Sequence, residues 1–251
     1  MTASSPHGLW SVARQGWRRE EPDRYRRQPD AGPDGFHRRV WDALDDGCTV
    51  LDLGAGAQPT VAPEARPGDC TYVGLDISAA ELRRAPAGSY DETVVADAAV
   101  AQPQLAGRFD LVVSLFALEH VEDLEQALAN TRSYLRPGGR MLAYLSGRYS
   151  PTSILNRGLP PVVSAALVQR LTGRDRESIH RAHYDRCSDR QLSRLLATGW
   201  AASEVVACYW GEKYFRFSRP VHALYGVYEE IVFRADRRQL ATHYLIDATR
   251  T

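Results

Sequence analysis

Lysine and net charge are scarce in this chain of 251 residues. Lys213 is the only lysine, and the 31 lysine and arginine residues are balanced by 31 aspartates and glutamates. Proteins that bind a nucleic-acid backbone usually have an excess of basic residues, so this balance argues against a nucleic-acid partner. A single lysine also disfavours a hydride-transferring oxidoreductase, which would need a Tyr-x-x-x-Lys pair or similar.

Long apolar runs and paired cysteines are missing as well. No run approaches the roughly twenty apolar residues of a membrane span, and residues 1–20 hold no apolar stretch of signal-peptide length. We therefore expect a cytoplasmic protein with no membrane partner. The four cysteines include no Cys-x-x-Cys pair, so we expect no metal and no disulfide framework. They are Cys48, Cys70, Cys187 and Cys208.

The composition is that of one globular α/β unit, with 44% hydrophobic and 25% charged residues. Residues 1–34 are rich in arginine, proline and glycine and too polar to build a core alone, so we interpret them as an N-terminal arm or lid. Residues 35–251 form the main domain, which opens with a helix over 36–44. It carries an insertion at about 147–187 that includes an amphipathic segment, 161–171.

The stretch VLDLGAGA, residues 50–57, is the most informative motif of the chain. An apolar run indicates a buried strand, and Gly54 and Gly56 allow a sharp turn and a close approach of the backbone to a ligand. Asp52 would repel a pyrophosphate, and Pro59 stands where a dinucleotide fingerprint has its third glycine. The loop therefore favours a ligand that has no phosphate and carries a positive amino group.

Acidic residues follow the next two apolar runs, at the ends that meet along one edge of a parallel sheet. Asp76 ends the second strand, close to the roughly twenty-residue offset at which an acid meets ribose hydroxyls. Asp97, followed by Ala98, ends the third strand. Alternating strands and helices predict a parallel sheet with its ligand at the carboxyl ends of the strands. The expected second to fourth strands are 72–75, 93–95 and 109–115.

Later elements are also predicted from local patterns. Leu124, Leu128 and Leu135 share one face of a helix that Pro137 and Gly138 would end before a fifth strand. A helix over 188–198 follows the insertion, introduced by Ser188 and Gln191 in capping-box spacing, and strands are expected at 202–209 and 242–247.

The succession resembles the class I S-adenosylmethionine (SAM)-dependent methyltransferases, in their small-molecule branch. The resemblance is close over residues 48–146 and loose elsewhere. It implies a Rossmann-like, seven-stranded, mostly parallel sheet with helices on both faces, an antiparallel last strand and a lid inserted after the fifth strand. It also implies SAM as cofactor and S-adenosylhomocysteine (SAH) as product. The implied cofactor-binding residues are Asp52, Gly54, Ala55, Gly56, Asp76, Ile77, Asp97, Ala98 and Leu115.

Methyl transfer asks chiefly for alignment of the reacting atoms, and only a neutral acceptor needs a base. His120 belongs to a Glu-His pair after the fourth strand, a position that lies near the cofactor in the resembled family; a histidine holding the loop by hydrogen bonds is an equal interpretation. His183 is the other candidate base, with Tyr184 beside it on the lid. Positioning alone, without a protein base, stays open.

The segment after the fourth strand also bears on the acceptor. Ser114 to Ala117 stands where enzymes that methylate amines of nucleic acids carry Asn/Asp-Pro-Pro-Tyr/Phe. The sequence therefore favours a small-molecule acceptor, with a hydroxyl of a secondary metabolite or sugar ahead of a carboxyl or activated carbon. The alternative is a SAM-binding protein that catalyses a non-methylating step or binds a partner. The oligomeric state is left open.

Overall fold

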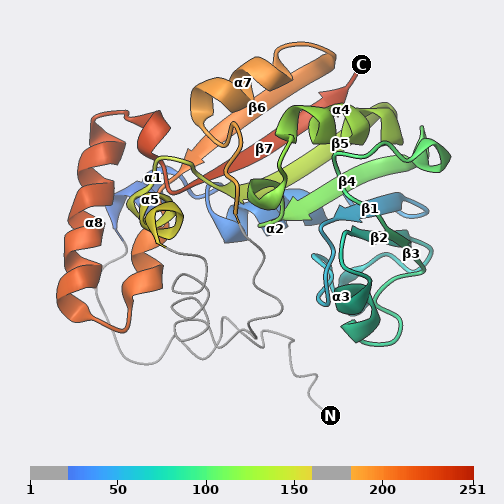
Figure 1. Cartoon of the computed structure of the whole chain (residues 1–251), viewed down its shortest axis with the longest axis horizontal. Coiled ribbons are helices and arrows are strands. Elements are labelled where there is room, and N and C mark those ends of the chain that lie inside the picture. The colour runs from blue at the N-terminus through green and yellow to red at the C-terminus, as the bar shows by residue number, and fades with distance from the viewer. Residues whose placement is uncertain (1–21, 160–181) are drawn as a thin grey trace.

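The computed structural model describes residues 22–159 and 182–251, which are built around a seven-stranded sheet in the order β3-β2-β1-β4-β5-β7-β6 (Figure 1). Strands β1 to β5 run parallel, whereas β7 is antiparallel to both of its neighbours. This is the predicted Rossmann-like sheet with an antiparallel last strand. The strands are β1 Thr49–Leu53, β2 Thr71–Asp76, β3 Glu92–Val95, β4 Phe109–Leu115, β5 Leu135–Ser146, β6 Trp200–Cys208 and β7 His243–Arg250.

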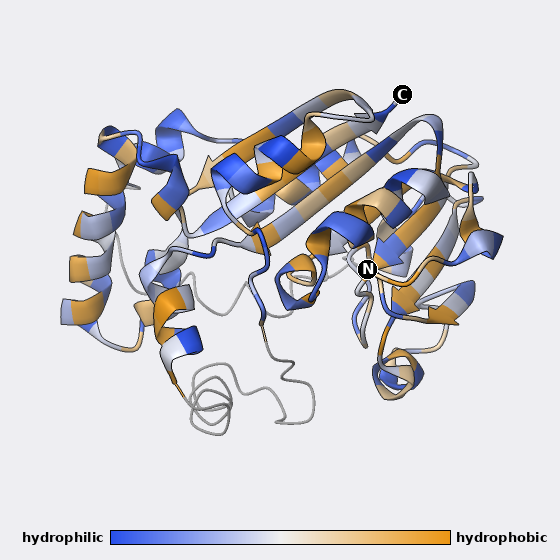
Figure 2. Cartoon of the chain, turned by 45° about the horizontal axis from the view of Figure 1, so that its top comes forward, coloured by the Kyte–Doolittle hydropathy of each residue, from blue (hydrophilic) through white to orange (hydrophobic). Residues whose placement is uncertain are grey.

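The central strands are apolar because both of their faces are covered (Figure 2). Successive side chains of a strand point to opposite faces, so Leu51 and Val112 belong to one core cluster, while their neighbours Val50 and Leu111 belong to the other. Helices α4 (Leu124–Tyr134) and α7 (Asp189–Leu196) contribute to the first core, and α2 (Pro33–Trp41) contributes to the second. The predicted helices on both faces are therefore confirmed.

The end of α4 differs from the sequence prediction. The helix ends at Tyr134, and Leu135 is already the first residue of β5, paired with Phe109 of β4. Pro137 disfavours helical dihedrals at the residue before it, and this brings the end of the helix forward. Leu135 still joins Leu124 and Leu128 in one core, so the apolar pattern identified burial correctly and the type of element wrongly.

Residues 22–34, the described end of the predicted arm, pack onto the C-terminal part of the chain. Helix α1 (Asp23–Arg27) buries Tyr25, whose ring stacks on Trp210 with centroids 3.9 Å apart. Helix α2 begins at Pro33, so the expected boundary between residues 34 and 35 falls inside a helix. The described end of the arm is thus held by tertiary contacts.

The two ends of the expected insertion meet at the carboxyl edge of the sheet. Helix α5 (Pro151–Gly158) follows β5, and the backbone N–H of Arg148 donates to the carbonyl of Cys187 at 2.6 Å. The amphipathic segment 161–171 lies outside the described residues. The Ser188 hydroxyl donates to the Gln191 side-chain oxygen at 2.9 Å, and it does not accept the capping hydrogen bond from a helix N–H.

A long helix, α8 (Arg219–Arg234), separates β6 from β7 together with the 3-10 turn η6 (Gly211–Phe215). Figure 1 shows α8 at one end of the molecule, on the side where β7 begins. None of the helices in residues 22–159 and 182–251 is long and apolar enough to cross a membrane. The sequence indicated no element for this aromatic segment. Four short 3-10 turns and one helix complete the described elements: η2 Pro63–Ala65, η3 Pro103–Leu105, η4 Leu118–His120, η7 Arg238–Leu240 and α3 Ala79–Arg84.

Candidate cofactor and acceptor site

The glycine loop after β1 adopts the backbone that its sequence predicts. Gly54 and Gly56 have φ angles of +76° and +56°, in the left-handed region that glycine tolerates best. A Cβ on Gly54 would come within 2.2 Å of the Ala117 Cβ, so the segment after β4 leaves no room for a side chain there. At Gly56 the nearest atom to such a Cβ would be an Asp76 carboxylate oxygen at 3.9 Å. The loop is open to a ligand on that side.

Backbone amides of the loop are satisfied inside the protein. The N–H groups of Gly54 and Ala55 both donate to the Leu75 carbonyl, at 2.8 and 3.1 Å. Tyr90 donates its hydroxyl to the Ala55 carbonyl at 2.7 Å and supports the loop from below the turn. The sequence did not single out Tyr90, because no local pattern connects it to a loop some 35 residues earlier.

Asp52 is buried beneath the loop and its carboxylate is fully engaged. It accepts from the N–H and the hydroxyl of Thr60, at 2.7 and 2.9 Å, and from the Tyr72 hydroxyl at 2.8 Å. Burial raises its pKa to about 6, against the lowering effect of these hydrogen bonds. The acid therefore anchors the loop, and any influence on a cofactor amino group acts through its charge.

Asp76 lies between the loop and the turn after β2. Its Oδ2 accepts from the Gly56 N–H at 2.9 Å and its Oδ1 from the Ser78 N–H at 2.7 Å. Each carboxylate oxygen has a second lone pair, so both can still accept from neighbouring ribose hydroxyls. Ile77, the next residue, leaves 63% of its side chain exposed, as a flat ligand ring would need. Asp97 caps its own turn by accepting from the Ala99 N–H at 2.8 Å, with Ala98 partly exposed beside it.

These residues fit a nucleoside ligand of the expected kind. β1, β2 and β3 are neighbouring parallel strands, so residues at or just beyond their carboxyl ends share one edge of the sheet. These residues are Asp52, the two glycines, Asp76 and Asp97. SAM, when bound, supplies an electrophilic methyl on a sulfonium. The free lone pairs of Asp76 would suit ribose hydroxyls, and the space beside Gly56 would leave room for the ligand.

Beside this edge, the segment after β4 brings an aromatic group together. Leu115 is partly exposed, and Phe116 has a left-handed φ of +53°, which is unusual for a residue with a side chain. The Phe116 ring contacts Tyr144 and His243, with centroids 5.2 and 5.5 Å apart. Tyr214 of η6 completes the group, with its hydroxyl 2.8 Å from His243 Nε2. We call Phe116, Tyr144, Tyr214 and His243 the aromatic wall.

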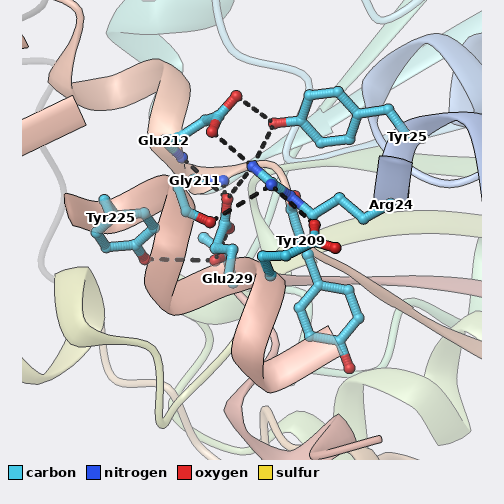
Figure 3. Close-up of polar contacts among 10 residues, drawn as sticks. Arg24, Tyr25, Tyr209, Gly211, Glu212, Tyr225 and Glu229 are labelled. Atoms are coloured by element: carbon cyan, nitrogen blue, oxygen red, sulfur yellow. Dashed lines mark hydrogen bonds and ion pairs between the residues drawn. The ribbon is translucent and has the colours of Figure 1, made fainter. Parts of the chain in front are cut away.

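A buried ionic network holds one side of this wall in place (Figure 3). Arg24 of α1 contacts Glu212 at 2.6 Å and Glu229 of α8 at 3.2 Å. Glu229 also accepts from the Gly211 N–H at 2.7 Å and from the Thr242 hydroxyl at 2.6 Å. Gly211 begins η6 and Thr242 precedes His243, so the network fixes both elements that carry the Tyr214–His243 pair. The sequence did not single out these residues, because Arg24 lies 188 positions from Glu212 and 205 positions from Glu229.

The predicted catalytic residues lie around Glu119. Its backbone carbonyl accepts from the N–H groups of both His183 and Tyr184, each at 2.9 Å. His183 places Nε2 3.6 Å from the exposed carboxylate of Glu122, with its own side chain 30% exposed. Tyr184 is buried, its pKa is raised chiefly by that burial, and its hydroxyl accepts from Asn156 at 3.2 Å. His120 ends the 3-10 turn η4 (Leu118–His120) and is partly exposed.

Comparisons with known proteins agree with this geometry. The family described as methyltransferase domain matches residues 24–198. The chain belongs to this family, that of the SAM-dependent methyltransferases, and its cofactor is SAM.

Curated relatives match a shorter part. A ubiquinone biosynthesis O-methyltransferase of Brucella ovis is 32% identical over 100 residues, which are 38% of this chain and 40% of that protein. The corresponding protein of a Chelativorans species is 30% identical over 100 residues, 38% and 39% of the two chains. The chain thus matches about two fifths of the length of these relatives.

Solved structures share the fold. A SAM-dependent methyltransferase of Mesorhizobium loti has a TM-score of 0.52 at 22% identity, covering 87% of this chain and all of that one. Phosphoethanolamine N-methyltransferase 2 of Haemonchus contortus, in complex with SAM, has a TM-score of 0.53 at 15% identity, covering 87% of this chain and 52% of that one.

Proposed function

We propose that this protein transfers the methyl group of SAM to a hydroxyl of a small molecule, a secondary metabolite or a sugar. The aromatic wall carries the proposal, because it stands beside the segment after β4, next to the glycine loop. Its partly exposed members, Phe116 and Tyr214, offer ring faces to an apolar or aromatic acceptor. The O-methyltransferase names of the curated relatives support a hydroxyl acceptor.

The residues at the edge of the sheet that carries the glycine loop bind SAM in this proposal. Asp76 accepts from both ribose hydroxyls, Ile77 covers the adenine, and Asp97 with Ala98 lies at the adenine amino group. Gly54, Ala55, Gly56 and Leu115 bound the methionine end, and the charge of Asp52 favours its amino group. SAM held in this way would supply its methyl group on the side where the aromatic wall lies.

A neutral hydroxyl needs a proton acceptor at neutral pH, and the sequence offers His120 and His183 for this, with Tyr184 beside them. If one histidine is the base, its alanine variant should lose about 100-fold to 10,000-fold in turnover with little change in SAM affinity. The other variant should stay near the wild-type rate.

Incubation of the purified protein with SAM and a panel of acceptors tests the function. The panel pairs aromatic hydroxyl compounds and sugars with amines and carboxylates of similar size, and SAH formation is measured. We expect SAH with hydroxyl acceptors. SAM binding without SAH from any acceptor class would instead support the alternative, a SAM-binding protein with a non-methylating role.

A further inference from the structure

One buried carboxylate beside the glycine loop has an oxygen without a hydrogen-bond partner in the described part of the chain. Glu119 is only 3% exposed. Its Oε1 accepts from the backbone N–H and the hydroxyl of Ser146, at 3.2 and 2.6 Å. Its Oε2 is buried and has no hydrogen-bond partner within residues 22–159 and 182–251. Buried carboxylate oxygens normally have partners, so this oxygen indicates a missing ligand.

The fold places this oxygen in the acceptor half of the site. Glu119 follows β4 by a single turn, and Ala117, two residues earlier, lies against Gly54. Ser146 ends β5 next to β4 and pairs in register with His243 of the aromatic wall. Because Ser146 holds Oε1 with two donors, the orientation of the carboxylate is fixed and Oε2 is left for another donor.

The two titratable groups of the aromatic wall nearest this site, Tyr214 and His243, are neutral. The pKa of Tyr214 is raised by burial first and by the negative charge of Glu119 second. Burial lowers the pKa of His243 to about 3, so its imidazole is neutral at physiological pH. Neither group takes a proton readily, since one is a protonated phenol and the other a very weak base.

We propose that Glu119 is the base of methyl transfer and that its Oε2 binds the acceptor hydroxyl. The acceptor oxygen bonds to the methyl carbon, the carbon–sulfur bond breaks with its electron pair on sulfur, and the hydroxyl proton moves to Oε2. The carboxylic acid then releases this proton to solvent. Glu119 replaces His120 and His183 in this role, and the assignment rests on the proposed hydroxyl acceptor.

A binding experiment tests the site without turnover. Phenol can donate a hydrogen bond to Oε2, whereas anisole, its methyl ether, cannot. We expect the SAH-saturated wild-type protein to bind phenol more tightly than anisole, by roughly 10-fold for a charge-assisted bond. Glu119→Gln should remove most of that preference and keep SAH affinity. Equal preference in the two proteins, or none in the wild type, overturns the assignment.

Steady-state kinetics with a series of phenols test the role of Glu119 as the base separately from the proposed O-methylation. With phenol, 4-chlorophenol, 4-cyanophenol and 4-nitrophenol as acceptors, hydroxyl acidity increases along the series. Glu119→Gln should lower kcat by about 100-fold to 10,000-fold on phenol and by much less on 4-nitrophenol, which ionises without a base. Glu125→Gln, an exposed acid on α4, is the matched control and should keep the wild-type rate on all four.

Each failure has its own signature. If the wild type methylates phenols and Glu119→Gln does so equally well, the base assignment is overturned and O-methylation stands. If the wild type yields SAH only with amines or carbon acceptors, the hydroxyl acceptor and the base both fall. Ser146→Ala is a second variant, for the case in which Glu119→Gln fails to fold. It removes one of the two donors to Oε1 and loosens the orientation of the carboxylate. We expect kcat on phenol to fall by about tenfold, with KM for SAM unchanged. An unchanged kcat there contradicts the proposal as well.

Discussion

Asp52→Asn should make the protein more stable at neutral pH. The carboxylate is fully buried, and burial raises its pKa from 3.8 to about 6. Folding therefore favours the protonated acid, and the wild type loses stability as the pH rises from about 4 to about 6. A shift of about 2 pH units corresponds to about 3 kcal/mol at 1.36 kcal/mol per unit, which sets the upper bound.

Asparagine can keep the local hydrogen bonds. Its carbonyl can accept from the Thr60 N–H and the Tyr72 hydroxyl, while its NH₂ donates to the Thr60 hydroxyl, whose oxygen has free lone pairs. The variant therefore removes the charge and leaves the loop anchored. Its free energy of unfolding should lack the decline between pH 4 and pH 6.

Urea denaturation of the cofactor-free protein at intervals from pH 4 to pH 8 measures this effect. The difference between variant and wild type should grow by roughly 2 to 3 kcal/mol between pH 4 and pH 6 and then stay constant up to pH 8. Thr60→Val, which removes one donor to the carboxylate, should instead raise the folded-state pKa further and extend the decline to higher pH. Parallel stability curves for wild type and Asp52→Asn would refute the reasoning, because they would mean that Asp52 titrates alike in the folded and unfolded chain.

Further outcomes follow from the same geometry. Asp76→Ala should weaken SAM binding about 10-fold to 100-fold by calorimetry; unchanged affinity contradicts its ribose role. Gly54→Ala should abolish detectable SAM binding while the far-ultraviolet circular dichroism is preserved. Normal SAM binding by this variant would mean that the glycine loop is only a turn and does not contact the cofactor. His183→Ala should keep turnover within about tenfold if Glu119 is the base, and a larger loss would return the role to His183. Arg24→Met should cost roughly 3 to 5 kcal/mol in urea denaturation because it leaves buried carboxylates unpaired, whereas Arg38→Met, at an exposed pair, should cost under about 1 kcal/mol; equal losses contradict the buried network.

The sheet and its glycine loop could be predicted because their signals are local. An apolar run, an acid and two glycines within eight residues specify a buried strand and a turn with positive φ, and the structure has both. The same holds for β4, whose observed bounds, Phe109 to Leu115, are those predicted. At Leu135 the prediction rested on apolar periodicity alone. Its burial was predicted correctly, but it was assigned to a helix and lies in strand β5.

Contacts between distant segments could not be predicted in this way. Cys48 and Cys70 have no motif in common, yet their sulfur atoms lie 3.2 Å apart because each precedes one of the adjacent strands β1 and β2. Tyr90 under the glycine loop, and Arg24 against Glu229, depend likewise on the order of strands in space. The Glu-His pair after β4 was visible in the sequence, but only the packing shows which oxygen of Glu119 lacks a partner within residues 22–159 and 182–251.

The two buried acids of the site, Asp52 and Glu119, differ in how many of their carboxylate oxygens have hydrogen-bond partners. Asp52 and Glu119 both lie at the carboxyl edge of the sheet and both are nearly inaccessible. Both oxygens of Asp52 accept hydrogen bonds from Thr60 or Tyr72, so the carboxylate anchors the glycine loop. Its buried charge lowers the free energy of unfolding at neutral pH. Among the described residues, one oxygen of Glu119 has no hydrogen-bond partner, which is useful only when a ligand donates to it. Removing the charge at Asp52 should therefore change unfolding far more than kcat, and removing it at Glu119 should change kcat far more than unfolding.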